Sequence, residues 1–322
     1  MKKSSSSFVP DIKPIPVKER SSQGKISIFL EEGREITLVG LVYGMEHTLS
    51  GANYSAKVLL DHYSQRIRIL EYSGTDFDNL ILSVRALAEA NNFDKIICYA
   101  RKKDWQEFLK HGYVLEAVLK YYFEGEDAYV VSKFRSQERS QSPNLMEEVL
   151  MIEEIMNGPM PEKLRVLPEG YSLRLAQRDD IPELISLYQR IFESYPSPLS
   201  HQEYVHSVFE KDNLFALITK GEKIVAAASA ELNHSCRSAE LTDCATLPEE
   251  RGGGLMSIIL NYLEVQLRER DFCCAYTLSR ARSFGMNRVF YHLNYEFLGR
   301  LVNNCDIYGA YEDMNLWTKA LK

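Results

Sequence analysis

The chain has 322 residues, a length that suits two domains better than one. Its 45% hydrophobic and 26% charged residues are typical of a globular protein. The formal net charge of −7 argues against a nucleic-acid-binding surface, and no apolar run approaches the roughly 18 residues that a membrane-spanning helix needs. We therefore expect a cytoplasmic protein with a small-molecule partner and without nucleic acid or membrane as a partner, while its oligomeric state stays open.

Cysteine and histidine form neither a disulfide framework nor a metal centre in this sequence. No two of the six cysteines make a C-x-x-C pair, and most lie in apolar, strand-like segments, so we expect reduced thiols. The seven histidines show no metal-ligand spacing. The sequence therefore predicts no metal cofactor.

The first part of the chain predicts a tail followed by a β-rich domain. Residues 1–24 are rich in Ser, Lys and Pro, without the apolar segment of a signal peptide, and we expect them to be disordered. In residues 25–135 the periodicity changes between strand and helix several times. The predicted strands are 26–28, 36–43, 66–70, 95–99, 114–123 and 128–134, and the predicted helices are 78–91 and 104–111.

Residues 136–167 predict a linker that contains one helix. Ser142-Pro143 offers a serine N-cap followed by proline at the first helical position. The helix should run to Met156 and end at the turn Asn157-Gly158-Pro159. We expect a domain boundary on each side of it.

The second domain, residues 168–322, alternates strands and helices in an order that predicts an α/β fold with an α+β mixed sheet. Its longest helix, 254–270, is amphipathic, and Ser200 should cap a shorter one. The predicted strands are 171–175, 214–219, 224–232, 237–245, 273–278 and two closing strands that end near residue 317; the predicted helices are 179–192, 200–209, 254–270 and 283–293.

The turn before helix 254–270 is the most informative stretch of the chain. Residues 248–254 read P-E-E-R-G-G-G. Consecutive glycines let backbone N–H groups turn toward a ligand, and a helix N-terminus adds unpaired donors and a partial positive charge. Together they predict a cradle for a pyrophosphate. Glu240, on the preceding strand, offers a carboxylate to a site that handles a proton.

Other interpretations of this region stay open. Three glycines also suit a plain tight turn. A Rossmann phosphate loop requires an acidic residue at the end of the next strand, whereas Asp271 precedes that strand, and no lysine follows the glycines as in a Walker loop. Asp243 is a rival to Glu240 as a base. Strand alternation puts these two carboxylates on opposite faces, so at most one of them should face the reacting group.

The element order and three local matches resemble the GCN5-related N-acetyltransferase (GNAT) family over residues 168–322. Residues 251–254 match the first four positions of the family's Q/R-x-x-G-x-G/A acyl-CoA loop, and Met256 departs from its last position. Residues 240–245, E-L-T-D-C-A, look like the family's fourth strand. Residues 287–295, N-R-V-F-Y-H-L-N-Y, are similar to its N-x-x-x-x-Y-x-x-x-G-F signature, with the tyrosine one position closer and an asparagine in place of the glycine.

This resemblance implies a GNAT fold in the C-terminal half, acetyl-CoA as the acyl donor, and roles for particular residues. Glu240 falls where some members place a general base, and Tyr291 falls near the tyrosine that protonates the departing CoA thiolate. The implied acetyl-CoA contacts come from the strand end, the loop, the helix start and the following helix: Cys244, Ala245, Thr246, Arg251, Gly252, Gly253, Gly254, Leu255 and Asn287.

The chemistry of acetyl transfer explains these residue types. An alkyl amine with a pKa of about 10.4 is protonated at neutral pH, and removing its proton costs about 5 kcal/mol. A carboxylate can accept that proton directly or through water, and a phenol can donate one to the leaving thiolate. A backbone N–H near Ala245 can polarise the thioester carbonyl.

A finer resemblance covers most of the chain. The runs 280–307 and 311–317 look like the β-lysine N6-acetyltransferases, which have a similar length and a similar N-terminal extension. This implies transfer to the side-chain amine of β-lysine, which gives N6-acetyl-β-lysine, a compatible solute. Arg280, Arg282 and Glu312 are candidates for binding the substrate's charged groups. Another small amine, a protein lysine, or a non-catalytic acyl-CoA-binding sensor remain alternatives.

The two halves of the chain also resemble each other. Residues 94–134 parallel residues 271–319, and a strand followed by a helix precedes each segment. In the first copy Leu109 stands at the position of Tyr291, and residues 73–76, S-G-T-D, replace R-G-G-G. We therefore expect an N-terminal degenerate GNAT-like half that binds no CoA, and a β-rich extension of another origin is the alternative.

Overall fold

The chain divides into two compact units in a computed structural model, which describes residues 24–40, 44–161, 165–192, 199–211 and 213–321. The predicted disordered tail, apart from Gly24, lies outside the described residues, and so do the last three residues of predicted strand 36–43. Unit 1 comprises residues 1–99, 104–115 and 131–141, and unit 2 comprises residues 100–103, 116–130 and 142–322.

Unit 1 contains a small two-stranded sheet and part of a larger one. The helix α1 buries Leu80, Val84 and Leu87, which recur at helical spacing. The strands are β1 (Gly24–Phe29), β2 (Glu35–Gly40), β3 (Gly44–Ser50), β4 (Tyr54–Asp61), β5 (Arg66–Gly74) and β6 (Lys95–Arg101), and the helices are α1 (Phe77–Ala90) and α2 (Trp105–Lys110).

A hairpin and two helices follow in sequence. They are β7 (Val114–Phe123), β8 (Glu126–Phe134), α3 (Gln137–Ser140) and α4 (Leu145–Asn157). α4 is the predicted linker helix, but the predicted serine cap at its start is wrong. Asn144, not Ser142, precedes the first turn, and its side chain makes no capping hydrogen bond.

Unit 2 confirms the predicted mixed α/β sheet, with the order β7-β14-β15-β13-β12-β11-β10-β9. Ser200 does not cap α6, because His201 precedes that helix and no side chain caps it. The elements are β9 (Tyr171–Leu175), α5 (Ile181–Ile191), α6 (Gln202–Glu210), β10 (Leu214–Lys220), β11 (Lys223–Asn233), β12 (Ser238–Thr246), α7 (Leu255–Glu269), β13 (Cys274–Arg280), α8 (Phe284–His292), β14 (Glu296–Ile307) and β15 (Ala310–Ala320).

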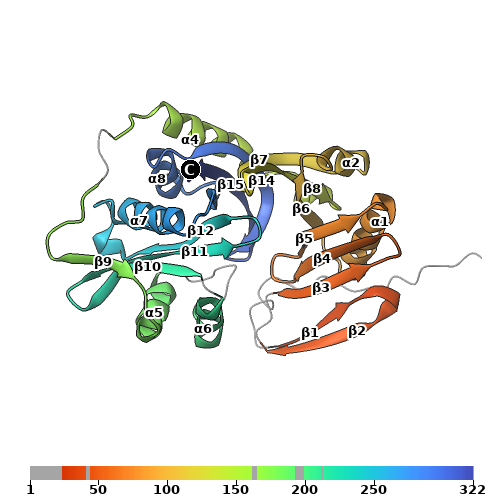
Figure 1. The fold of residues 1–322 in the computed structure, drawn as a ribbon, viewed down its shortest axis with the longest axis horizontal. Helices are drawn as coiled ribbons and strands as arrows, with labels where there is room; N and C mark the ends of the chain where they lie inside the picture. The colour runs from red at the N-terminus through yellow and green to blue at the C-terminus, as the bar shows by residue number, and fades with distance from the viewer. Residues whose placement is uncertain (1–23, 41–43, 162–164, 193–198, 212, 322) are drawn as a thin grey trace, which may run out of the picture. The chain divides into compact units, whose positions relative to one another are not determined.

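Helices cover both faces of the sheet in unit 2. α5 and α6 lie on one face, and α7 and α8 lie on the other (Figure 1). The apolar stripe of α7 is buried, as its sequence predicts, and Trp317 of β15 is fully buried in the same core. This arrangement gives the sheet two distinct sides, each with its own helix pair.

The hairpin strand β7 lies beside β14 in the unit 2 sheet. Ala117 pairs with Gly299, whose φ is +141°. A Cβ atom at Gly299 would lie 2.4 Å from the carbonyl oxygen of Glu116, so only glycine allows this approach. Lys120 of β7 also pairs with Glu296 of β14, with 2.5 Å between their Nζ and Oε2 atoms.

The two halves share a strand order. The N-terminal order β4-β5-β6-β8-β7 corresponds to β11-β12-β13-β15-β14, and in each case the strand before the long helix is parallel to the strand after it. This correspondence agrees with the internal similarity of the sequence, and the common origin of the halves remains a proposal.

Candidate active site

The ladder between β12 and β13 ends early. The two strands pair in parallel from Ser238 with Cys274 to Glu240 with Tyr276, although β12 continues to Thr246 and β13 to Arg280. The strands therefore part immediately after Glu240. In a parallel sheet such a parting is where a ligand can reach backbone groups of an internal strand.

A β-bulge interrupts β12 at the same level. Asp243 and Cys244 together lie opposite Ala228 of β11, and Asp243 adopts a φ of +52°. The Oδ2 atom of the buried Asp243 accepts a hydrogen bond of 2.6 Å from the hydroxyl of Ser229. Burial and the nearby Asp243 carboxylate raise the pKa of Tyr188 on α5, which places Asp243 toward that helix.

The prediction that Glu240 and Asp243 lie on opposite faces of the sheet is wrong because of this bulge. Glu240 pairs with Glu231, and Ser229, two residues before Glu231 on β11, binds Asp243. Residues two apart on a regular strand share a face. Asp243 therefore reaches the face of the sheet that carries Glu240, because the extra residue in the bulge shifts the alternation.

Glu240 is half-buried in a row of side chains that crosses three strands. Its register partners are Glu231 on β11 and Tyr276 on β13. Sequence reasoning missed Glu231 and Tyr276 as neighbours of the candidate base, because strand register joins residues that local patterns do not relate.

The glycine loop leaves an open backbone surface at Gly252 and Gly253, whereas the side chain of Arg165 lies over Gly254. Gly252 and Gly254 have φ values of +87° and +80°, and a Cβ atom at Gly252 or Gly253 would meet nothing within 4 Å. Gly254 precedes the helix, and no side chain caps the first turn. The N–H groups there suit a pyrophosphate, so the residues fit the implied ligand.

Charged side chains stabilise this loop. The Nε atom of Arg251 donates a hydrogen bond of 3.1 Å to the carbonyl oxygen of Thr246, which ties the loop to the end of β12. The Tyr171 hydroxyl and the Lys220 ammonium hold the pKa of Glu250 below its usual value. Because Glu250 is paired with Lys220, its charge opposes an anionic ligand less than a lone carboxylate would.

The remaining predicted acetyl-CoA contacts differ in exposure. Ala245 and Leu255 are buried in the core, and Thr246 is half-buried at the strand end. Met256, which departs from the family loop, is also packed in the core. Burial raises the pKa of the Cys244 thiol, so this group stays neutral.

Asn287 makes all its hydrogen bonds within the protein and is fully buried. Its Oδ1 atom accepts from Ser279, Asn315 and Trp317. Its Nδ2 atom donates to the carbonyl oxygens of Arg280, at the end of β13, and Ser283, at the start of α8. The side chain thus joins the end of β13 to α8 and orients the helix that carries Tyr291.

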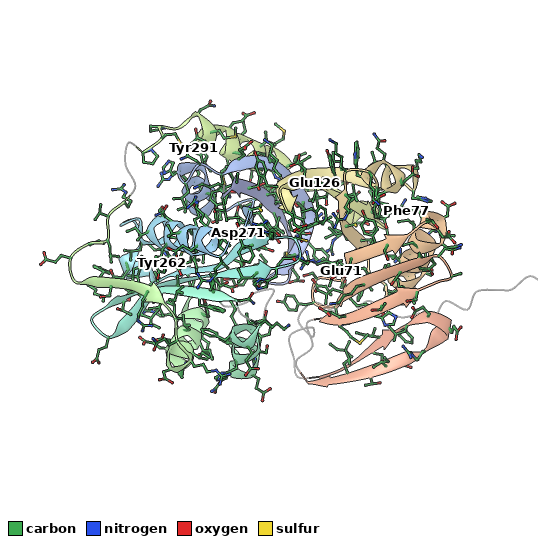
Figure 2. All side chains as sticks on the ribbon, in the orientation of Figure 1. Glu71, Phe77, Glu126, Tyr262, Asp271 and Tyr291 are labelled. Carbon is green, nitrogen blue, oxygen red and sulfur yellow. The ribbon has the colours of Figure 1, made fainter. Side chains whose placement is uncertain are left out.

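The hydroxyl of Tyr291 on α8 donates a hydrogen bond of 2.8 Å to the carbonyl oxygen of Met156, at the end of α4. Figure 2 shows Tyr291 where α8 and α4 run side by side. An ion pair of 3.3 Å between Glu148 and Arg300 attaches α4 to β14. Burial and the nearby Asp313 raise the pKa of Glu148 to about 8.

The charged candidates at the strand ends pair with protein groups. Arg280 binds Glu312 with two hydrogen bonds of 2.6 and 2.5 Å, and Arg282 lies 3.7 Å from Glu147. Within the described ranges, no three His, Cys, Asp or Glu side chains come together as a metal site. None of the described helices is long and apolar enough to cross a membrane.

The corresponding turn of the N-terminal half is closed. The carboxylate of Asp76 caps α1 by accepting from the backbone N–H of Asn79, at the place where an anion would bind. A Cβ atom at Gly74 would lie 2.2 Å from the carbonyl oxygen of Asn53, so the backbone is already covered. The N-terminal half thus lacks the open surface of the loop at Gly252.

Comparison with known proteins gives the family. The model of the Acetyltransferase (GNAT) family matches residues 181–291. N-acetyltransferase YodP of Bacillus subtilis is 35% identical over 82% of this chain and 96% of its own length. The β-lysine N(6)-acetyltransferases of Methanosarcina mazei and Methanococcus maripaludis are 37% and 30% identical, over 76% and 81% of this chain and 98% and 95% of their own lengths.

Among solved structures, the ribosomal-protein-S18-alanine N-acetyltransferase of Escherichia coli is 18% identical with a TM-score of 0.42, covering 47% of this chain and 94% of its own. The family rests on the curated relatives, which match nearly their whole length. The chain belongs to the GNAT family of acetyl-CoA-dependent N-acetyltransferases.

Proposed function

We propose that this chain is a cytoplasmic enzyme that moves an acetyl group from acetyl-CoA to the side-chain amine of β-lysine and so forms N6-acetyl-β-lysine, a compatible solute. Two relatives that match over nearly their whole length carry this activity in their names. The structural observation that supports acetyl transfer best is the parting of β12 and β13 immediately after Glu240, beside the open glycine loop.

In this proposal the loop and the end of β12 hold the donor. The N–H groups of residues 252–255 bind the pyrophosphate of acetyl-CoA, and Arg251 adds a positive charge. Cys244, Ala245 and Thr246 offer backbone groups to the pantetheine chain where β12 has left β13. A backbone N–H at Ala245 polarises the thioester carbonyl.

Two side chains carry the proton transfers. Glu240 accepts the proton of the substrate ammonium, directly or through water, and the neutral amine attacks the thioester carbon. Tyr291 then donates its proton to the departing thiolate, for which its hydroxyl must leave the carbonyl oxygen of Met156. Asn287 acts as a positioning residue in this scheme, because its own hydrogen bonds fix the start of α8.

We retain the proposed domain division as 25–135 for a degenerate GNAT-like domain, 136–167 for a linker and 168–322 for the catalytic domain. The Asp76 cap and the covered backbone at Gly74 support the view that the first copy binds no CoA. Accordingly, one acetyl-CoA should bind per chain.

The test of the function is a panel of amines incubated with acetyl-CoA, with thiol release and product mass as readouts. β-Lysine should give an acetylated product with the highest kcat/KM, ahead of lysine, a polyamine and a lysine-containing peptide. A different best amine would reassign the substrate. Acetyl-CoA binding without any acetylated product would favour the non-catalytic sensor.

Replacing Gly253 with aspartate should weaken acetyl-CoA binding by well over tenfold, because the new carboxylate would face the pyrophosphate. Gly253→Asn has nearly the same size and no charge, so it serves as the matched control and should bind more tightly than the aspartate variant. Both side chains enter open space in the protein. Calorimetric titration measures the dissociation constant and the stoichiometry of acetyl-CoA binding. Unchanged affinity in the folded aspartate variant would mean that the pyrophosphate binds at another site.

A further inference from the structure

Glu231 and Glu240 face each other on the side of the sheet that α6 covers. Phe215 of β10 stacks on Phe209 of α6, with ring centroids 4.5 Å apart, and pairs across the sheet with Ser229. Glu231 lies two residues beyond Ser229 and so shares its face, and Glu240 is the register partner of Glu231. The carboxylates are therefore direct cross-strand neighbours, with Cβ atoms roughly 5 Å apart.

This face is the acceptor side of the proposed reaction. α7, whose first turn follows the glycine loop, lies on the opposite face (Figure 1). A donor held by that loop reaches the α6 face only where β12 and β13 part, which is next to Glu240. The amine must then approach from the α6 face, where Glu231 is the next side chain along the row.

An aromatic pair continues the row on the other side of Glu240. Tyr276 is the register partner of Glu240, and its ring packs edge-on against Tyr122, with centroids 5.7 Å apart. The Nδ2 atom of Asn233 donates a hydrogen bond of 3.3 Å to the hydroxyl of Tyr122. Carboxylates beside aromatic rings suit a substrate that carries more than one positive charge.

Two carboxylates cannot usefully serve one amine. Like charges directly opposite each other on neighbouring strands are destabilising unless a positive charge offsets them. If both glutamates surrounded the reacting nitrogen, they would favour its protonated form and oppose its attack. The arrangement suits a division in which one carboxylate takes a proton and the other holds a second amine in its protonated form.

We infer that Glu231 is a specificity-determining residue that binds a second ammonium group of the amine substrate while Glu240 deprotonates the first. This inference rests on the proposed acetyl transfer and adds the substrate class: a short diamino compound whose two nitrogens are separated by a few carbons. β-Lysine belongs to that class, and a monoamine of the same length lacks the group that Glu231 binds.

The test compares β-lysine with 6-aminohexanoate, which has the reacting amine and the carboxylate but no second amine. Glu231→Gln should raise KM for β-lysine by about 10- to 100-fold, the range for a lost charge-assisted hydrogen bond, and should change kcat/KM for 6-aminohexanoate by less than about threefold. Glu269→Gln, an exposed change on α7, is the matched control and should alter neither substrate.

The preference of the wild-type enzyme for β-lysine over 6-aminohexanoate should therefore shrink in the Glu231 variant. An equal loss with both substrates, or no loss with either, would overturn the role of Glu231. Failure of the wild-type protein to acetylate any amine would instead overturn the proposed function, so the two failures are distinguishable. A midpoint of thermal unfolding equal to that of the wild-type protein would exclude a general structural defect in the variant.

Discussion

Replacing Glu240 with glutamine should lower kcat for β-lysine by about 10²- to 10⁴-fold at pH 7, the usual contribution of a general base. The loss should shrink as the pH rises toward the amine's own pKa of about 10.4, because a growing fraction of the substrate is then already neutral. The measurement is kcat against pH from 6 to 10, approximately, for the wild-type and variant enzymes, with acetyl-CoA saturating.

Asp243→Asn is the matched control for that experiment. Asp243 is buried and bound by Ser229 inside the bulge, and asparagine keeps both the size and the tolerance of a positive φ. This variant should retain most of its activity at pH 7 and show no rescue at high pH. If instead Asp243→Asn loses activity while Glu240→Gln keeps it, Asp243 is the base.

Tyr291→Phe should lower kcat by about 10²- to 10⁴-fold with little change in acetyl-CoA affinity, because the phenol is the proposed proton donor to the thiolate. The hydroxyl also binds the carbonyl oxygen of Met156, so its loss has a structural component. A lost neutral hydrogen bond contributes about 1 kcal/mol to stability. Steady-state kinetics, a binding titration and thermal unfolding together separate the two effects.

Tyr262→Phe on α7 is the matched control, since it removes a hydroxyl from another partly buried tyrosine of the same unit (Figure 2). It should leave kcat within about threefold of wild type, because Tyr262 has no place in the proposed chemistry. If the Tyr291→Phe enzyme keeps its kcat and loses only stability, the role of this hydroxyl is to attach α4 to α8 and not to donate a proton.

Local pattern predicts most of the elements whose buried residues recur at regular spacing. β9 occupies residues 171–175 as predicted, and α7 spans 255–269 against a prediction of 254–270. β3 and β4 are not predicted. Leu49 is the one buried side chain of β3, whereas Ala56, Val58 and Leu60 of β4 are buried in alternation, so β4 is a strand that the sequence analysis missed. Glycine spacing indicates the loop equally well, since the backbone conformation there depends on residues adjacent in sequence.

The rest of the candidate site depends on relations that local pattern does not contain. The bulge at Asp243 is visible only as a shift in the pairing of β12 with β11. It reverses the alternation of side chains between the two faces of β12, on which the choice between Glu240 and Asp243 as the base depends. Glu231 meets Glu240 through register, and Tyr291 meets Met156 over a separation of 135 residues. Such contacts form when the sheet and the helices pack, so they follow from tertiary structure.

Unit 2 is not one continuous segment of the chain, because β7 belongs to it although β7 precedes residue 142. A fragment starting at residue 142 would lack Ala117 and Lys120, leave the backbone of β14 at Gly299 as an open edge, and remove Tyr122 from Tyr276. Open strand edges pair with other chains and promote aggregation. The acetyltransferase unit is therefore not a portable module, and grafting it onto another protein would require transferring the hairpin as well.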